Sequence, residues 1–141
     1  MKKWNIALLL VVLLFACEKF PEGGSVYDSR TNLIGTWQYK EVNIDYHHIP
    51  DTLFRQHYKN SDIVFEKGSM VRYHWRDGEN HFVQNRQATY VFDYNKTFLN
   101  IVFADQPFEM LMYKVRKITD QEFHFEYDAD NSHYDVYLIK K

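Results

Sequence analysis

From residue 36 to the end of the chain, apolar and polar residues alternate in short runs. Alternation over about four to eight residues is typical of a strand that buries one face. In one of these runs, Val71, Tyr73 and Trp75 share a face and polar residues separate them. We therefore expect eight strands, at residues 36–45, 62–66, 70–75, 81–93, 97–103, 110–118, 122–127 and 133–140.

Turn residues separate the runs, and the links after residue 61 are short enough for hairpins. Asp77-Gly78 is the strongest hairpin signal, because these residue types accept the positive φ of a tight turn. Strands joined in this way form a meander, which closes as a barrel or folds as a sandwich. Closure removes the exposed edges of the sheet. We therefore expect an all-β fold, an eight-stranded antiparallel up-and-down barrel.

The first run and the link after it depart from simple alternation. The phase changes between Tyr39 and Val42, which predicts a β-bulge near Lys40-Glu41. In the long link at residues 47–60, the apolar positions are spaced for one face of a short helix, with Asp51 as the expected N-cap. This helical insertion between the first two strands would lie across the mouth of the barrel. It would act there as a plug that completes the core or as a lid over a ligand.

The first residues have the three parts of a secretory signal peptide. Lys2 and Lys3 precede an unbroken apolar run at residues 6–15, and Ala16 is a small residue at a plausible cleavage point. The run is too short for a spanning helix, which needs roughly 20 residues. We therefore expect residues 1–16 to be a signal peptide that is removed.

The segment Leu14-Phe15-Ala16-Cys17 resembles the lipobox of bacterial lipoproteins. The resemblance implies that the thiol of Cys17 takes a diacylglyceryl group and that the freed amine is then acylated. An ordinary secretory signal is the alternative, but Cys17 is the only cysteine in the chain. We expect a lipidated Cys17 and flexible tether at residues 17–31, followed by a domain at residues 32–141. In the enteric sorting pattern, Glu18 after the cysteine favours the outer membrane of the cell envelope.

The net charge and the length of the chain limit the classes of function that are possible. Removal of residues 1–16 leaves 125 residues, enough for a single domain. These residues carry 15 Lys and Arg against 19 Asp and Glu, a net charge of −4. Nucleic-acid binding requires a basic surface, so we expect no nucleic-acid partner. The membrane, reached through the lipid anchor, is the expected partner.

The segment Leu33-Ile34-Gly35-Thr36-Trp37 resembles the G-x-W motif that opens the first strand of lipocalins and of small bacterial lipocalin-like lipoproteins. The resemblance implies a lipocalin-like barrel over residues 32–141. It also implies that Gly35 allows a tight entry into the strand and that Trp37 packs across the closed end. In the family an Arg from the last strand lies over this Trp, and here Lys140 or Lys141 stands near that place.

Sequence motifs for catalysis or metal binding are absent. There is no G-x-S-x-G elbow, no glycine-rich phosphate loop, no HExxH and no cysteine cluster. The seven histidines include no H-x-H pair. We therefore expect a protein that is not an enzyme and that has no cofactor and no metal site.

Aromatic residues make up 18% of the chain, and many of them fall on the faces that the alternation assigns to the interior. Core filling explains large rings, but a buried Tyr hydroxyl needs a partner, so several of them favour a partly polar cavity. We expect this cavity to bind a small apolar or amphipathic ligand. An accessory subunit that docks on an envelope protein complex is the alternative. The candidate ligand-binding residues are Tyr39, Phe54, Tyr58, Tyr73, Trp75, Tyr90 and Tyr113.

Overall fold

The computed structural model describes residues 32–141, so the predicted signal peptide, Cys17 and the tether lie outside the described residues. Its elements follow the alternation closely. Two strands match their predicted ranges to the residue, and the other barrel strands begin and end within two residues of them. The elements are β1 (Gly35–Ile44), β2 (His47–His48), α3 (Asp51–His57), β3 (Asp62–Glu66), β4 (Met70–Arg76), β5 (Phe82–Phe92), β6 (Phe98–Phe103), β7 (Met110–Ile118), β8 (Glu122–Ala129) and β9 (Ser132–Lys140).

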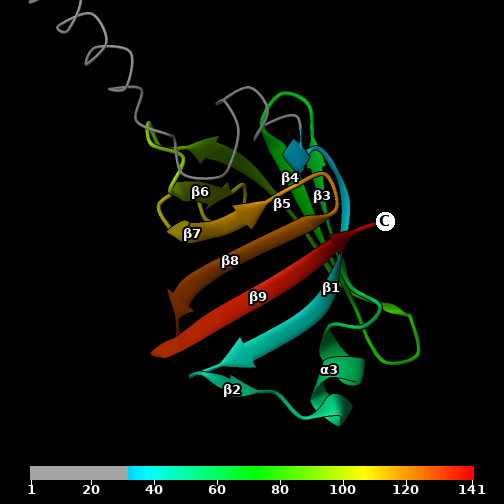
Figure 1. Cartoon of the computed structure of the whole chain (residues 1–141). Coiled ribbons are helices and arrows are strands. Elements are labelled where there is room, and N and C mark those ends of the chain that lie inside the picture. The colour runs from blue at the N-terminus through cyan, green and yellow to red at the C-terminus, as the bar shows by residue number, and fades with distance from the viewer. Residues whose placement is uncertain (1–31) are drawn as a thin grey trace, which may run out of the picture.

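The strands form a closed antiparallel barrel (Figure 1). From β3 to β9, each strand pairs with the next one in the chain, and β1 lies between β3 and β9. The pairing of β9 with β1 closes the barrel and excludes the sandwich. β2 is an extra two-residue strand on the edge of β1. The prediction of an eight-stranded lipocalin-like barrel, with a helical insertion between its first two strands, is confirmed.

The predicted bulge in the first strand is also confirmed. The register of β1 against β9 shifts between Tyr39 and Glu41. A bulge adds one residue to a strand, so the residues after it that face the interior are one position out of phase with those before it. Trp37 and Val42 are an odd number of residues apart, yet both are fully buried.

One end of the barrel, which we call the Trp37 end, is filled by packed rings. The Trp37 ring meets Phe123 edge-on with centroids 5.9 Å apart, and Phe65 meets Phe123 in the same way at 5.9 Å. The indole N–H of Trp37 donates to the carbonyl of Leu33 at 2.7 Å, so the polar atom of the buried ring is satisfied. This end is therefore a solid part of the core.

Lys140 covers Trp37 from the last strand. Its ammonium lies 5.2 Å from the centre of the Trp37 ring and donates to the carbonyl of Asn32 at 2.9 Å. Gly35 makes room for this contact, because a Cβ at that position would lie 2.6 Å from Cε of Lys140. Gly35 also has a φ of +138°, which a residue with a side chain rarely adopts. Only glycine fits this entry into β1 without displacing Lys140.

The opposite end, which we call the α3 end, carries the helix and β2 (Figure 1). The prediction that Asp51 is the N-cap of α3 is wrong. Pro50 occupies the N-cap position with a φ of −54°, and Asp51 lies in the first helical turn without making a side-chain cap bond. Its negative carboxylate still interacts favourably with the positive, N-terminal end of the helix dipole. The first strand also ends earlier than predicted, because Asp45 and Tyr46 have positive φ and turn the chain.

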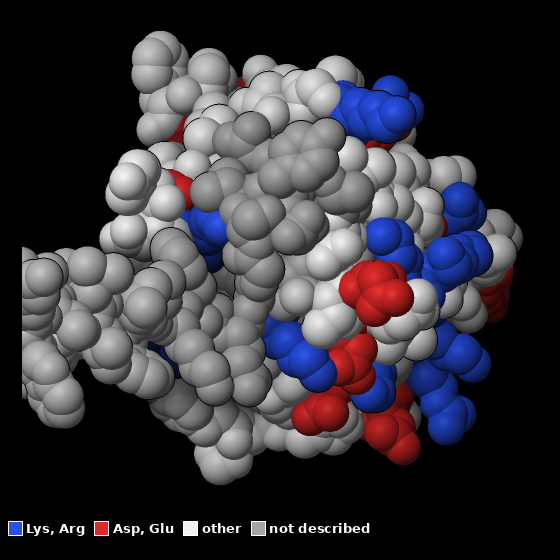
Figure 2. Space-filling view, turned by 45° about the horizontal axis from the view of Figure 1, so that its top comes forward, with Lys and Arg blue, Asp and Glu red and all other residues white. Residues whose placement is uncertain are grey.

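Charges of both signs mix on the outer surface. On the face shown in Figure 2, Lys and Arg side chains lie beside Asp and Glu. Ion pairs of this kind join neighbouring strands, as between Arg116 of β7 and Glu126 of β8 at 2.7 Å. Exposed pairs such as these contribute little to stability, about 0–1 kcal/mol each.

Candidate functional site

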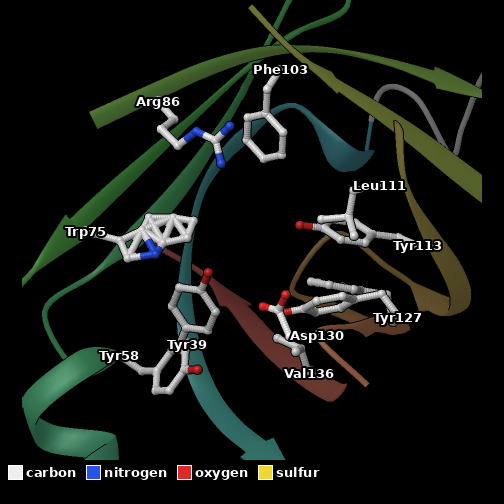
Figure 3. Close-up of a pocket in the computed structure, with 11 residues that line it drawn as sticks. Tyr39, Tyr58, Trp75, Arg86, Phe103, Leu111, Tyr113, Tyr127, Asp130 and Val136 are labelled. Atoms are coloured by element: carbon white, nitrogen blue, oxygen red, sulfur yellow. The ribbon is translucent and has the colours of Figure 1, made fainter. Parts of the chain in front are cut away.

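A cavity of about 270 Å³ lies inside the barrel, toward the α3 end (Figure 3). Side chains from β1, β4, β5, β6, β7, β8 and β9 reach it, and Tyr58 reaches it from the end of α3. Most of the wall is aromatic. The aromatic lining residues are Tyr39, Tyr58, Trp75, Phe103, Tyr113, Phe125 and Tyr127.

Tyrosine hydroxyls give this aromatic wall its polar groups. The hydroxyls of Tyr73 and Tyr113 are hydrogen-bonded to each other at 3.0 Å in the buried interior. The hydroxyls of Tyr39, Tyr58 and Tyr127 make no hydrogen bond to another residue of the described range 32–141. No sealed side-chain N or O atom in this range lacks a partner, so these three hydroxyls open onto accessible space. They are available to a ligand or to water.

Burial keeps the tyrosine hydroxyls neutral. It raises the pKa of Tyr39 and of Tyr113 well above the ordinary value of 10.0, and neighbouring tyrosines raise both further. Burial also raises the pKa of Tyr73 and of Tyr127. Each hydroxyl therefore keeps its proton, and can donate a hydrogen bond, further into alkaline solution than an exposed tyrosine does.

These raised pKa values predict that the barrel loses stability in alkali. The folded state holds the protons more tightly than the unfolded state, whose tyrosines ionise near pH 10. The stabilising contribution is complete below about pH 10 and is lost as the pH rises above it. Urea unfolding midpoints measured from about pH 8 to about pH 12 should fall across this window. Tyr113→Phe should reduce the fall and Tyr94→Phe, at an exposed site, should not; equal behaviour of the two variants would contradict the assignment.

Arg86 places a charge in the wall of the cavity. It faces inward from β5, beside Tyr73 of β4. Its guanidinium lies 3.7 Å from the centre of the Phe103 ring and binds the carboxylate of Asp105 with two hydrogen bonds, of 2.8 and 3.2 Å. This contact lowers the pKa of Asp105. Sequence reasoning missed Arg86, although Arg86 lies two positions before Ala88 and therefore on the same inward face of β5.

The structure brings together four of the seven candidate residues. Tyr39, Tyr58, Trp75 and Tyr113 line the cavity. The other three do not line it. Phe54 stacks on Tyr58 with ring centres 6.1 Å apart, Tyr73 lies behind the wall, and Tyr90 lies toward the Trp37 end. The hydroxyl of Tyr90 donates to the carbonyl of Glu66 at 3.2 Å.

A second group of polar side chains lies outside the barrel, on β8 and β9. Ligand atoms of His124, Glu126 and Asp135 lie within 4.8 Å of one another. His124 is already bonded to Asp135 at 2.5 Å, and Glu126 is paired with Arg116. The ligand atoms of this group therefore already have hydrogen-bond or ion-pair partners. No sequence motif marks this group, because only the pairing of Glu126 with Asp135 across β8 and β9 brings the carboxylates together.

The function is inferred from the cavity and the fold. A comparison with models of protein families found no match for this chain, and a comparison with curated proteins also found none. Within residues 32–141, no helix has the length and apolar character needed to cross a membrane.

Proposed function

We propose that the protein is a membrane-anchored lipocalin-like lipoprotein that binds a small apolar or amphipathic molecule in its barrel and does no catalysis. The observation that carries the proposal is the cavity of about 270 Å³ with aromatic walls and unpaired hydroxyls. Ligand sites are typically concave, mostly apolar and supplied with a few polar groups, with volumes from about 300 Å³ upward. The cavity lies just below this range, so its volume favours a compact ligand.

The helix α3 supports the same proposal. Tyr58, which follows it, packs against Tyr39 with ring centres 5.1 Å apart and lines the cavity. Ser61 fastens this segment to β4, because its hydroxyl donates to the carbonyl of His57 and accepts the backbone N–H of Arg76 at 2.9 Å. We propose that α3 covers the ligand as well as completing the core.

The anchor in this proposal comes from the leader. The signal peptide at residues 1–16 would be removed, and the lipidated Cys17 with the tether at residues 17–31 would then hold the barrel at the outer membrane. Stable attachment takes two or more acyl chains, which a triacylated cysteine supplies.

Native mass spectrometry of the full chain, purified gently from its own membrane, tests the ligand. The expected result is a small-molecule adduct that Leu111→Trp removes, because Leu111 lines the cavity and the larger ring would fill it. Met112→Trp is the matched control, since Met112 is the next residue on β7 and lies exposed on the outer face. The absence of any small-molecule adduct, or an adduct that survives Leu111→Trp, would contradict the proposal.

A surface patch favours a second candidate, an accessory subunit of an envelope protein complex. Apolar residues lie together on the outer face of β5, β6 and β7, where Met110 pairs with Val102 and both Val91 and Met112 flank Asn100. Met110 is 60% exposed and Val91 is 57% exposed. Exposed apolar patches mark protein interaction sites when they are contiguous and large. A co-purifying protein in the same spectra, lost in Met110→Lys, would favour this candidate.

A further inference from the structure

Arg86 places a positive charge on one side of the cavity. Among the described residues that line it, Arg86 and Asp130 are the charged ones. In Figure 3, the guanidinium lies beside Phe103, on the side of the cavity away from Tyr58, while Asp130 lies near Tyr127 and Val136. A ligand between them would meet a cation at one side only.

The hydrogen bonds of Arg86 leave one nitrogen unused. A guanidinium has five N–H groups. Nε donates to Asp105, and Nη2 donates both to Asp105 at 2.8 Å and to the side-chain carbonyl of Gln106 at 2.6 Å. Nη1, with two N–H groups, makes no hydrogen bond to another residue in the range 32–141.

Asp105 does not cancel the charge on the cavity side. The side chain of Asp105 is 59% exposed, whereas that of Arg86 is 21% exposed. Water therefore screens the carboxylate more than it screens the guanidinium, which favours a positive potential toward the cavity. A carboxylate that accepts a charge-assisted hydrogen bond from Nη1 would match this potential.

We propose that the cavity takes a compact aromatic carboxylate, with its carboxylate at Nη1 of Arg86 and its ring between the aromatic walls. This inference rests on the proposed function and adds the chemical class of the ligand. The ring would lie against Trp75 and Tyr113, and the open hydroxyls of the α3 end would meet any polar group on the far side of the ring. A single negative charge suits the site, because Asp105 and Asp130 disfavour a second one.

The test compares an acid with its neutral amide. The full chain, held in lipid nanodiscs, is titrated calorimetrically with 2-naphthoate and with 2-naphthamide, and titrations of empty nanodiscs are subtracted. Hydrogen bonds to a charged group are strong enough that 2-naphthoate should bind about tenfold or more tightly than the amide. Arg86→Gln should remove this preference. Arg72→Gln is the matched control, because it removes the same charge from the outer face of the neighbouring strand β4.

A measurement on the unaltered protein guards against misfolding of the Arg86 variant. In the full chain labelled with ¹⁵N-arginine, 2-naphthoate should shift the guanidinium signals of Arg86 and leave those of Arg72 in place. Equal affinity for acid and amide would overturn the inference but leave the proposed function standing. A preference that persists in Arg86→Gln would overturn the role of Arg86. Binding of neither compound would overturn the inference, and native mass spectrometry then judges the proposed function separately.

Discussion

Cys17→Ser is expected to detach the protein from the membrane. A serine hydroxyl cannot form the thioether to diacylglycerol, so the variant would carry none of the acyl chains, whose buried CH₂ groups contribute about 0.8 kcal/mol each. The protein should collect as an uncleaved precursor or in the soluble fraction, as immunoblots of separated membrane and soluble material would reveal. Folding of residues 32–141 should not change, because the barrel contains its own core.

Glu18→Gln is the matched control for this experiment, since it alters the neighbouring residue and keeps the thiol. It should stay with the membrane fraction. Mass spectrometry of the mature protein from its native host gives the decisive measurement. An unmodified Cys17 in that protein would rule out the lipoprotein interpretation.

Trp37→Ala is expected to remove a large part of the stability of the barrel. Trp37 is fully buried, and truncation of a buried Trp or Phe to Ala lowers the free energy of unfolding by about 3–5 kcal/mol. The variant also loses the edge contact with Phe123 and leaves the carbonyl of Leu33 without its donor. Small domains have a total free energy of unfolding of about 5–15 kcal/mol. Urea titrations followed by circular dichroism would measure the loss.

Phe108→Ala is the control, because Phe108 is an aromatic residue whose side chain is fully exposed in the link between β6 and β7. Its truncation should change the free energy of unfolding by no more than about 0.5 kcal/mol. If both truncations had the same effect, the Trp37 end would not be the packed core that the geometry describes.

The strands could be predicted from the sequence because alternation maps directly onto the pleat of a strand. Val71, Tyr73 and Trp75 face inward as the pattern requires, and even the bulge after Tyr39 is visible as a change of phase. The prediction of Asp51 as the N-cap of α3 was wrong, because Asp51 and the proline before it compete for one position and only the backbone decides between them.

The site was harder to predict than the fold. Alternation separates inside from outside, but it does not give the height of a residue along the barrel axis. Tyr90 and Tyr113 both face inward, yet the former belongs to the Trp37 end and the latter to the cavity. Arg86 was missed for a different reason. When a charged residue falls at an inward-facing position, the buried part of the strand is usually taken to end there. Here Phe103 and Asp105 contact the Arg86 guanidinium and stabilise it in the wall of the cavity.

The pairing of β1 with β9 also governs how the barrel can be made. It joins the first strand of the domain to the last, with Trp37 opposite Lys140 and Ile44 opposite Tyr134. Every other pairing between barrel strands can form without β9, so the sheet remains open along β1 and β8 until β9 docks. Contacts between distant parts of a chain form slowly, because the loop between them must first be closed. The docking of β9 against β8 and β1 therefore decides when the interior is sealed from water.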